Sequence, residues 1–122
     1  MNQDDKIANI INIASIVWNI ASTKTGISLC GVHIQQYQSS NSIYWQSSVG
    51  EMRGSVFDSK CTSYDGISID NTLDHLLVKV KDCAESKIQD ISKSYLEQRE
   101  KYSKSLDEIS IALGKSLEAE NK

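Results

Sequence analysis

Nucleophilic or acid–base chemistry in this chain can come only from a sparse set of residues. Cys61, with His33 or His75 as its base, would form the pair that activates a thiol for nucleophilic attack. No spacing along the chain favours that pairing, and the short signatures of nucleotide cradles, metalloproteases and serine hydrolases are absent. We therefore expect no catalytic residues and a protein that is not an enzyme, with a cysteine-dependent enzyme as the least favoured alternative.

The cysteines also bear on metal binding and on compartment. Cys30, Cys61 and Cys83 are an odd, widely spaced set without a CxxC pair, and the chain has two histidines to complete a zinc site. We predict no metal, no cofactor and free thiols in a reducing cytoplasm. The apolar run 7–21 is shorter than the ~20 apolar residues of a membrane span, and the residues before it are acidic, unlike a signal peptide. We expect a cytoplasmic protein that does not enter a membrane.

Recognition chemistry is concentrated in an uncharged stretch, residues 35–48, which is rich in amides, hydroxyls and aromatic rings. Rigid rings supply contact area and Ser, Asn and Gln supply adaptable hydrogen bonds, as is typical of binding surfaces. Arg53 follows shortly after, and its planar guanidinium can hold a carboxylate or phosphate. The predicted ligand- or partner-binding residues are Tyr37, Tyr44, Trp45, Arg53, Phe57 and His33. The alternative is that these rings only pack on the two faces of a sheet.

The distribution of charge argues against one class of partner. The net charge is −3, from 13 Lys+Arg and 16 Asp+Glu. Most of these charges lie in residues 72–122, whereas residues 7–50 hold only Lys24. Proteins that bind a nucleic-acid backbone show a clustered basic footprint, so we expect no DNA-backbone binding.

These residues must be positioned by regular elements, and the first is predicted to be a helix from Asp4 to about Ser22, with Asn2 as its N-cap. Apolar residues recur there with the spacing of one helix face: Ile7, Ile10, Ile11, Ala14, Val17, Trp18 and Ala21. Only a thin polar ribbon remains, so this helix should be buried, either in the core or between subunits. For the second case the expected contacts are Ile10, Val17 and Trp18.

Residues 26–70 are predicted to form an antiparallel meander of three or four strands, because their connections are too short for parallel crossovers. The strand-like segments are 26–35, 43–46, 52–57, 61–64 and 67–69. Turn-forming residues separate them at 39–42, 49–51 and 58–60.

A long amphipathic helix is predicted from Thr72 onward, with Asn71 as its N-cap. One apolar stripe runs from Leu73 to Ala84 and a second from Ile88 to Leu117, with a frame shift between them like a coiled-coil stutter. At ~1.5 Å per residue, about 45 unbroken residues would span roughly 68 Å, so the helix must project, fold back or pair with another chain. A break around 92–94 or 103–105 would give two helices instead. The predicted oligomer contacts are Ile88, Ile91, Tyr95, Tyr102, Leu106, Ile109 and Leu113.

These elements predict an α+β protein of one domain, with a helix and sheet in residues 1–71 and a helical extension in residues 72–122. We expect a non-enzymatic homo-oligomer that binds a host protein or a nucleotide-like small molecule through its polar-aromatic sheet region. The alternative is a purely structural helical assembly module. In size and composition the chain is similar to phage-encoded inhibitors of host defence and to small immunity proteins. That resemblance implies an accessory protein of a bacterium or its phage.

Overall fold

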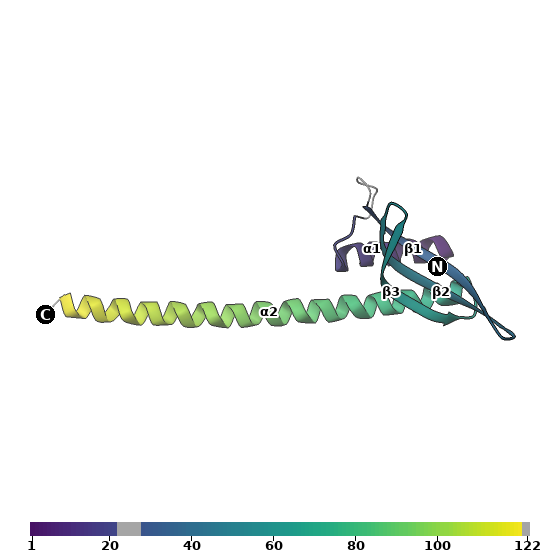
Figure 1. The fold of residues 1–122 in the computed structure, drawn as a ribbon. Coiled ribbons are helices and arrows are strands. Elements are labelled where there is room, and N and C mark those ends of the chain that lie inside the picture. The colour runs from purple at the N-terminus through teal and green to yellow at the C-terminus, as the bar shows by residue number, and fades with distance from the viewer. Residues whose placement is uncertain (22–27, 121–122) are drawn as a thin grey trace. The chain divides into compact units, whose positions relative to one another are not determined.

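The computed structural model describes residues 1–21 and 28–120, and it shows a helix, three antiparallel strands and a long second helix (Figure 1). The elements are α1 (Gln3–Val17), β1 (Ser28–Ser39), β2 (Ser42–Arg53), β3 (Val56–Gly66) and α2 (Ile69–Glu120). The predicted α+β class and the antiparallel meander are confirmed, with three strands. Gly26 and Ile27 of the predicted first strand, and Ser22 at the predicted end of the first helix, lie outside the described residues.

Local hydrogen bonds determine where α1 begins and ends. The Asn2 side chain accepts a hydrogen bond from the Asp5 backbone N–H at 2.8 Å, so the predicted N-cap is confirmed. At the other end Asn19 has a left-handed φ of 53°, and the Ile20 N–H donates back to the Ser15 carbonyl at 2.9 Å. A left-handed residue with such a backward bond ends a helix, so α1 stops at Val17, earlier than predicted.

The sheet has the strand order β1-β2-β3, and each hairpin closes over two residues. The first loop is Ser40-Asn41, inside the predicted turn at 39–42, and the second is Gly54-Ser55. Ser40 and Gly54, the first residue of each loop, have left-handed φ values of 53° and 60°. Tight hairpins need a positive φ in the loop, which glycine adopts without strain.

The turns predicted at 49–51 and 58–60 are wrong, because both segments lie inside strands. β2 runs straight through Gly50, which pairs with Gly31 on one side and Ser59 on the other. Opposite Gly50 the pairing shifts by one residue, since Val49 faces Cys61. The turn-forming residues of β3 therefore mark a β-bulge, which leaves Lys60 unpaired in the ladder.

α2 begins earlier than predicted because Ser68, not Asn71, is its N-cap. The Ser68 hydroxyl accepts from the Asn71 N–H and the Ser68 carbonyl accepts from the Thr72 N–H, both at 3.0 Å. The Asn71 side chain instead accepts from the Ile67 N–H at 3.0 Å, outside the helix. From Ile69 the helix continues unbroken to Glu120, so the alternative of two helices, with a break around 92–94 or 103–105, does not occur.

The chain divides into two compact units, Met1–Lys87 and Ile88–Lys122. We call the first the head and residues 88–120 of α2 the tail helix. The first turns of α2 belong to the core of the head. That core joins α1, one face of the sheet and the start of α2, and its fully buried aliphatic side chains are Ile10, Ala14, Val49, Leu73, Leu76 and Val80.

One buried polar cluster and one ion-pair cluster connect these layers. The Ser47 hydroxyl on β2 lies 3.0 Å from both the carbonyl and the hydroxyl of Thr72 on α2. The Lys6 ammonium on α1 lies 2.9 Å from Asp74 and 3.4 Å from Asp70, and these carboxylates raise the pKa of Lys6. Both clusters hold the start of α2 against the rest of the head.

Candidate binding surface

The strand register divides the predicted binding residues between two faces of the sheet. Residues directly opposite in an antiparallel pair share a face, and faces alternate along each strand. The face that carries Cys30, Val32 and Val49 packs on the helices. We call the other the open face. It comprises Leu29, Gly31, His33, Gln35 and Tyr37 of β1, Tyr44, Gln46, Ser48, Gly50 and Met52 of β2, and Phe57, Ser59 and Thr62 of β3.

A row of two glycines shapes one end of the open face. Gly31 and Gly50 pair directly, so this row has no side chains on β1 and β2. His33 and Phe57 lie in the rows on either side, and their ring centroids approach to 5.7 Å with an interplanar angle of 37°. Met52 covers the row from the Phe57 side, with its Cγ 3.3 Å from where a Cβ on Gly31 would be. The missing side chains therefore let two rings and a thioether gather into one patch, the His33–Phe57–Met52 patch.

The other end of the open face carries a tyrosine pair. Tyr37 and Tyr44 are direct cross-strand partners, beside the hairpin loop that joins β1 to β2. The next row holds Gln35 and Gln46, so amides separate the tyrosines from the His33–Phe57–Met52 patch. Tyr37 is 39% exposed and Met52 is 38% exposed, so both ends are accessible.

Trp45 and Arg53 do not join this surface. Side chains alternate between the two faces along β2, and Trp45 and Arg53 fall on the covered face together with Val49; Trp45 is half-buried there. The Arg53 guanidinium Nε donates to the Glu51 carboxylate, which also accepts from the Ser28 hydroxyl at 3.1 Å. This pairing lowers the pKa of Glu51 and raises that of Arg53. Of the six predicted binding residues, the structure thus gathers His33, Tyr37, Tyr44 and Phe57 on one face.

The sequence analysis missed Met52 and the glycine row as parts of this surface. The signal that finds them is the pairing register, because it sets Met52 opposite Leu29 on β1, far away in sequence, and opposite Phe57 across the β2–β3 hairpin. The predicted turn at 49–51 hid the row by placing Gly50 outside any strand.

The enzyme alternative depends on Cys61 and a histidine base. The thiol is half-buried, and burial together with the neighbouring Cys83 raises its pKa to about 11. A thiol with that pKa is overwhelmingly protonated at neutral pH, whereas attack requires the thiolate. His33 lies on the open face while Cys61 has the alternation of the covered face, opposite Val49. His75, the other candidate base, lies beside the Asn71 amide at 3.4 Å.

In residues 1–21 and 28–120, no three His, Cys, Asp or Glu side chains come together as a metal site would require. No helix in that part of the chain is long and apolar enough to span a membrane.

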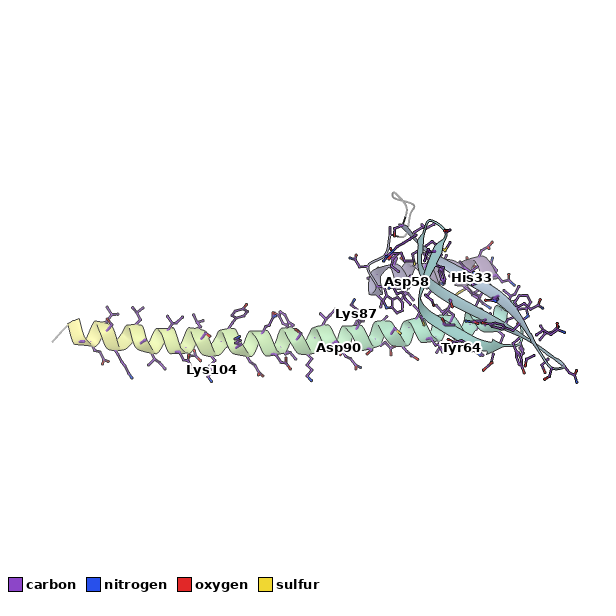
Figure 2. All side chains as sticks on the ribbon, in the orientation of Figure 1. His33, Asp58, Tyr64, Lys87, Asp90 and Lys104 are labelled. Carbon is purple, nitrogen blue, oxygen red and sulfur yellow. The ribbon has the colours of Figure 1, made fainter. Side chains whose placement is uncertain are left out.

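The predicted oligomer contacts fall into a buried set and an exposed set. Ile10 and Val17 are buried and Trp18 is half-buried in the head, so their surfaces are covered by the chain itself. The apolar residues of the tail helix are instead between 53% and 71% exposed: Ile88, Ile91, Tyr95, Tyr102, Leu106, Ile109, Leu113 and Leu117. Figure 2 shows side chains projecting from the tail helix along its length, Asp90 and Lys104 among them.

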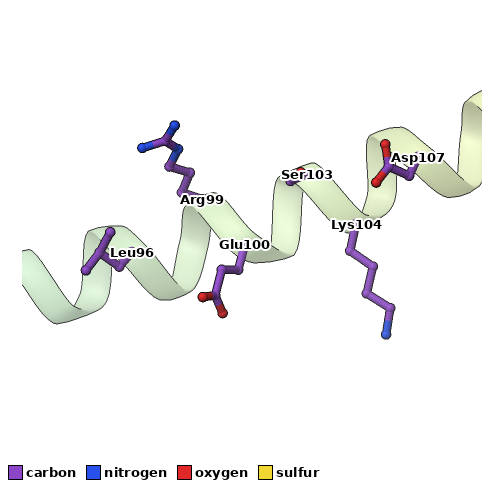
Figure 3. A pocket seen from close by; sticks show the side chains of 6 residues that line it. All are labelled: Leu96, Arg99, Glu100, Ser103, Lys104 and Asp107. Carbon is purple, nitrogen blue, oxygen red and sulfur yellow. The ribbon is translucent and has the colours of Figure 1, made fainter.

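A second strip of the tail helix is shallow and polar. It is lined by Leu96, Arg99, Glu100, Ser103, Lys104 and Asp107 (Figure 3). All six residues come from one helix, and Arg99 and Lys104 leave it in opposite directions. A strip with a single wall cannot enclose a small ligand, because binding sites for such ligands are concave.

No protein-family model, no curated protein and no solved structure matches this chain. No relative therefore assigns a role to the open face or to the tail helix.

Proposed function

We propose that this chain is a non-enzymatic binding protein that takes a partner protein on its open face and self-associates through its tail helix. We place it among small accessory or inhibitory proteins of a bacterium or phage, which act by occupying a surface of their target. Assembly would give each particle at least two open faces. Two linked faces bind a multivalent target more tightly than one, without any new contact.

The observation that carries this proposal is the accessible aromatic content of the open face. The centroids of the His33 and Phe57 rings lie 5.7 Å apart, on either side of a row that has only glycines on β1 and β2, and Met52 adds an adaptable thioether. Tyr37 and Tyr44 supply a second anchor, with amides between the two ends. Rigid aromatic anchors surrounded by polar groups are the composition of binding hot spots.

A protein fits this face better than a nucleotide-like ligand does. A nucleotide needs a cation for its phosphate close to the ring on which its base stacks. Arg53, the predicted phosphate ligand, already pairs with Glu51 and has the alternation of the opposite face from Tyr37 and Tyr44. An open sheet surface with anchors at both ends instead suits an extended protein contact.

Capture from the lysate of its own host cells, with matched variants, tests this proposal. The wild type, Tyr37→Ser and Ile43→Ser are immobilised at equal amounts, and retained proteins are quantified by mass spectrometry. Ile43 is the control because it is an exposed apolar residue of the same hairpin with the opposite alternation. We expect a protein retained by the wild type and by Ile43→Ser but lost from Tyr37→Ser. Equal retention by all three proteins, as a purely structural module predicts, would overturn the proposal, and so would retention by none.

A further inference from the structure

We propose that the tail helix binds a second copy of this chain, parallel and in register, through an 11-residue repeat. This inference deepens the assembly part of the proposed function and does not depend on the open face.

The repeat is visible along the whole of α2. Residues 73, 84, 95, 106 and 117 are spaced by 11 and are all apolar or aromatic. Steps of three and four residues connect them through one stripe: Leu73, Leu77, Val80, Ala84, Ile88, Ile91, Tyr95, Gln98, Tyr102, Leu106, Ile109, Leu113 and Leu117. The frame shift between Ala84 and Ile88 is therefore part of an 11-residue repeat and not an isolated stutter. Eleven residues in three turns give about 3.67 residues per turn, close to the α-helical 3.6, so the stripe stays nearly parallel to the helix axis.

Burial changes along this stripe while its spacing does not. Leu73 and Val80 are fully buried in the head core. From Ile88 onward the apolar members are more than half exposed. The tail helix thus carries the same kind of packing stripe as the start of α2, with its apolar side chains exposed.

The size of the stripe fits a dimer interface. Its eight exposed apolar or aromatic residues, at roughly 100 Å² each, would remove about 800 Å² per subunit from water. Two copies would bury about 1,600 Å², the size of a typical specific protein interface. A second copy of this chain brings an apolar stripe of the same length, so each stripe can cover the other completely.

Gln98 selects the parallel, in-register arrangement. It is the one polar member of the stripe, between Tyr95 and Tyr102. In a parallel pair in register, Gln98 faces the same residue of the second copy, and two amides can donate to and accept from each other. An antiparallel pair that sets Ile88 opposite Leu117 would put Gln98 beside Leu106, where its amide lacks such a partner. Buried polar residues fix register in coiled coils through this difference. An antiparallel pair centred on Gln98 would join the two amides, but it would set Leu113 and Leu117 beside Ala84 and Val80, and Val80 is fully buried in the head. The 11-residue spacing also predicts that the two helices run straight or form a weakly right-handed supercoil.

Disulfide trapping of the full chain distinguishes the arrangements. In the parallel pair, position 109 of one copy faces position 109 of the other, within the roughly 4–7 Å between Cα atoms that a disulfide allows. In the antiparallel pair the two positions are about 13 residues apart along the axis, roughly 20 Å at ~1.5 Å per residue. The variant is Ile109→Cys. The matched control is Lys104→Cys, five residues earlier and about 140° around the same helix.

Mild oxidation followed by tryptic peptide mapping gives the result, because the linked peptide identifies the position despite the native cysteines. We expect Ile109→Cys to form a species of twice 13.6 kDa, linked through position 109 in both copies, and Lys104→Cys to form none through position 104. Light scattering of the wild type at micromolar concentration should give at least twice 13.6 kDa. A monomeric mass, or an assembled protein without the 109 link, would overturn the inference. If the link forms while Tyr37→Ser binds its partner normally, the assembly stands and the open-face proposal fails.

Discussion

Gly50 in the middle of β2 should tolerate no side chain, and replacing it with alanine tests the register on which the open face depends. A Cβ at this position would lie 2.1 Å from the Asp58 carbonyl oxygen and 2.8 Å from the Ser59 Cα. Both are backbone atoms of β3, which cannot rotate away as a side chain can. To reach an ordinary contact distance of 3.4 Å, the Cβ and the Asp58 oxygen must move apart by about 1.3 Å. Close packing of the head resists a backbone shift of that size.

The expected cost follows from what that movement breaks. Overpacking a well-packed site costs about 1–3 kcal/mol. Displacing β3 beside its bulge also weakens about one ladder hydrogen bond, worth roughly 0.5–1.5 kcal/mol. Gly50→Ala should therefore lower the free energy of unfolding by about 2–4 kcal/mol, a large part of the ~5–15 kcal/mol typical of a domain.

Gly31, the direct cross-strand partner of Gly50, is the matched control. A Cβ there meets only the Met52 Cγ at 3.3 Å, the flexible part of an unbranched side chain. Gly31→Ala should change the free energy of unfolding by less than ~1 kcal/mol, because two effects oppose each other. The contact with Met52 destabilises the fold, whereas alanine lowers the conformational entropy of the unfolded chain and so stabilises the fold.

Urea unfolding followed by tryptophan fluorescence measures both variants, because Trp18 and Trp45 are half-buried in the head. All proteins must be compared at one concentration, since self-association shifts apparent stability. Losses that agree within about 0.5 kcal/mol for the two variants would refute the register that pairs Gly50 with β3.

Three further predictions concern the head. Ser47→Ala should lower the free energy of unfolding by about 1–3 kcal/mol, because it leaves the buried Thr72 carbonyl and hydroxyl without that partner. Its control is Ser63→Ala, which removes a buried hydroxyl without a described partner and should be neutral or stabilising. Equal losses of unfolding free energy for the two variants, measured by denaturant unfolding, would contradict this. Ser40→Gly should raise the unfolding free energy by about 1 kcal/mol, because glycine takes the left-handed φ of 53° without strain, and a lower midpoint in urea would count against that turn geometry. Iodoacetamide should modify Cys61 slowly at pH 7 and about tenfold faster per pH unit up to its pKa of about 11, read by peptide mass spectrometry, whereas a plateau near pH 8 would show an ordinary thiol.

The helices were predictable from the sequence because their signal is local. Spacing over three to four turns predicted α1 and α2, and the Asn2 cap needed only the residues that follow it. The same spacing left open whether α2 is one helix or two, because a break at its serines would not change the apolar stripe. The sequence analysis assigned the N-cap of α2 to Asn71, but Ser68, three residues earlier, is an equally good cap type. Which one bonds to the first turn depends on the path of the chain leaving β3.

The sheet was less predictable because its decisive facts are non-local. Gly50 is typical of a turn in sequence, yet it is required inside β2 by the close approach of the β3 backbone. Tyr44 and Trp45 are neighbours in sequence but lie on opposite faces, and only the pairing with β1 assigns each side chain to its face. The same pairing separates Arg53 from the rings with which the sequence analysis grouped it.

Binding of the captured partner by titration calorimetry tests most directly whether the open face is the functional surface. The wild type, Tyr37→Ser and Ile43→Ser are each titrated with the purified partner at one salt concentration. Loss of an aromatic anchor should weaken binding at least tenfold for Tyr37→Ser, a change of about 1.4 kcal/mol, while Ile43→Ser stays within about twofold of the wild type. Equal affinities for the wild type and Tyr37→Ser, or a larger loss for Ile43→Ser, would contradict the assignment of function to the open face.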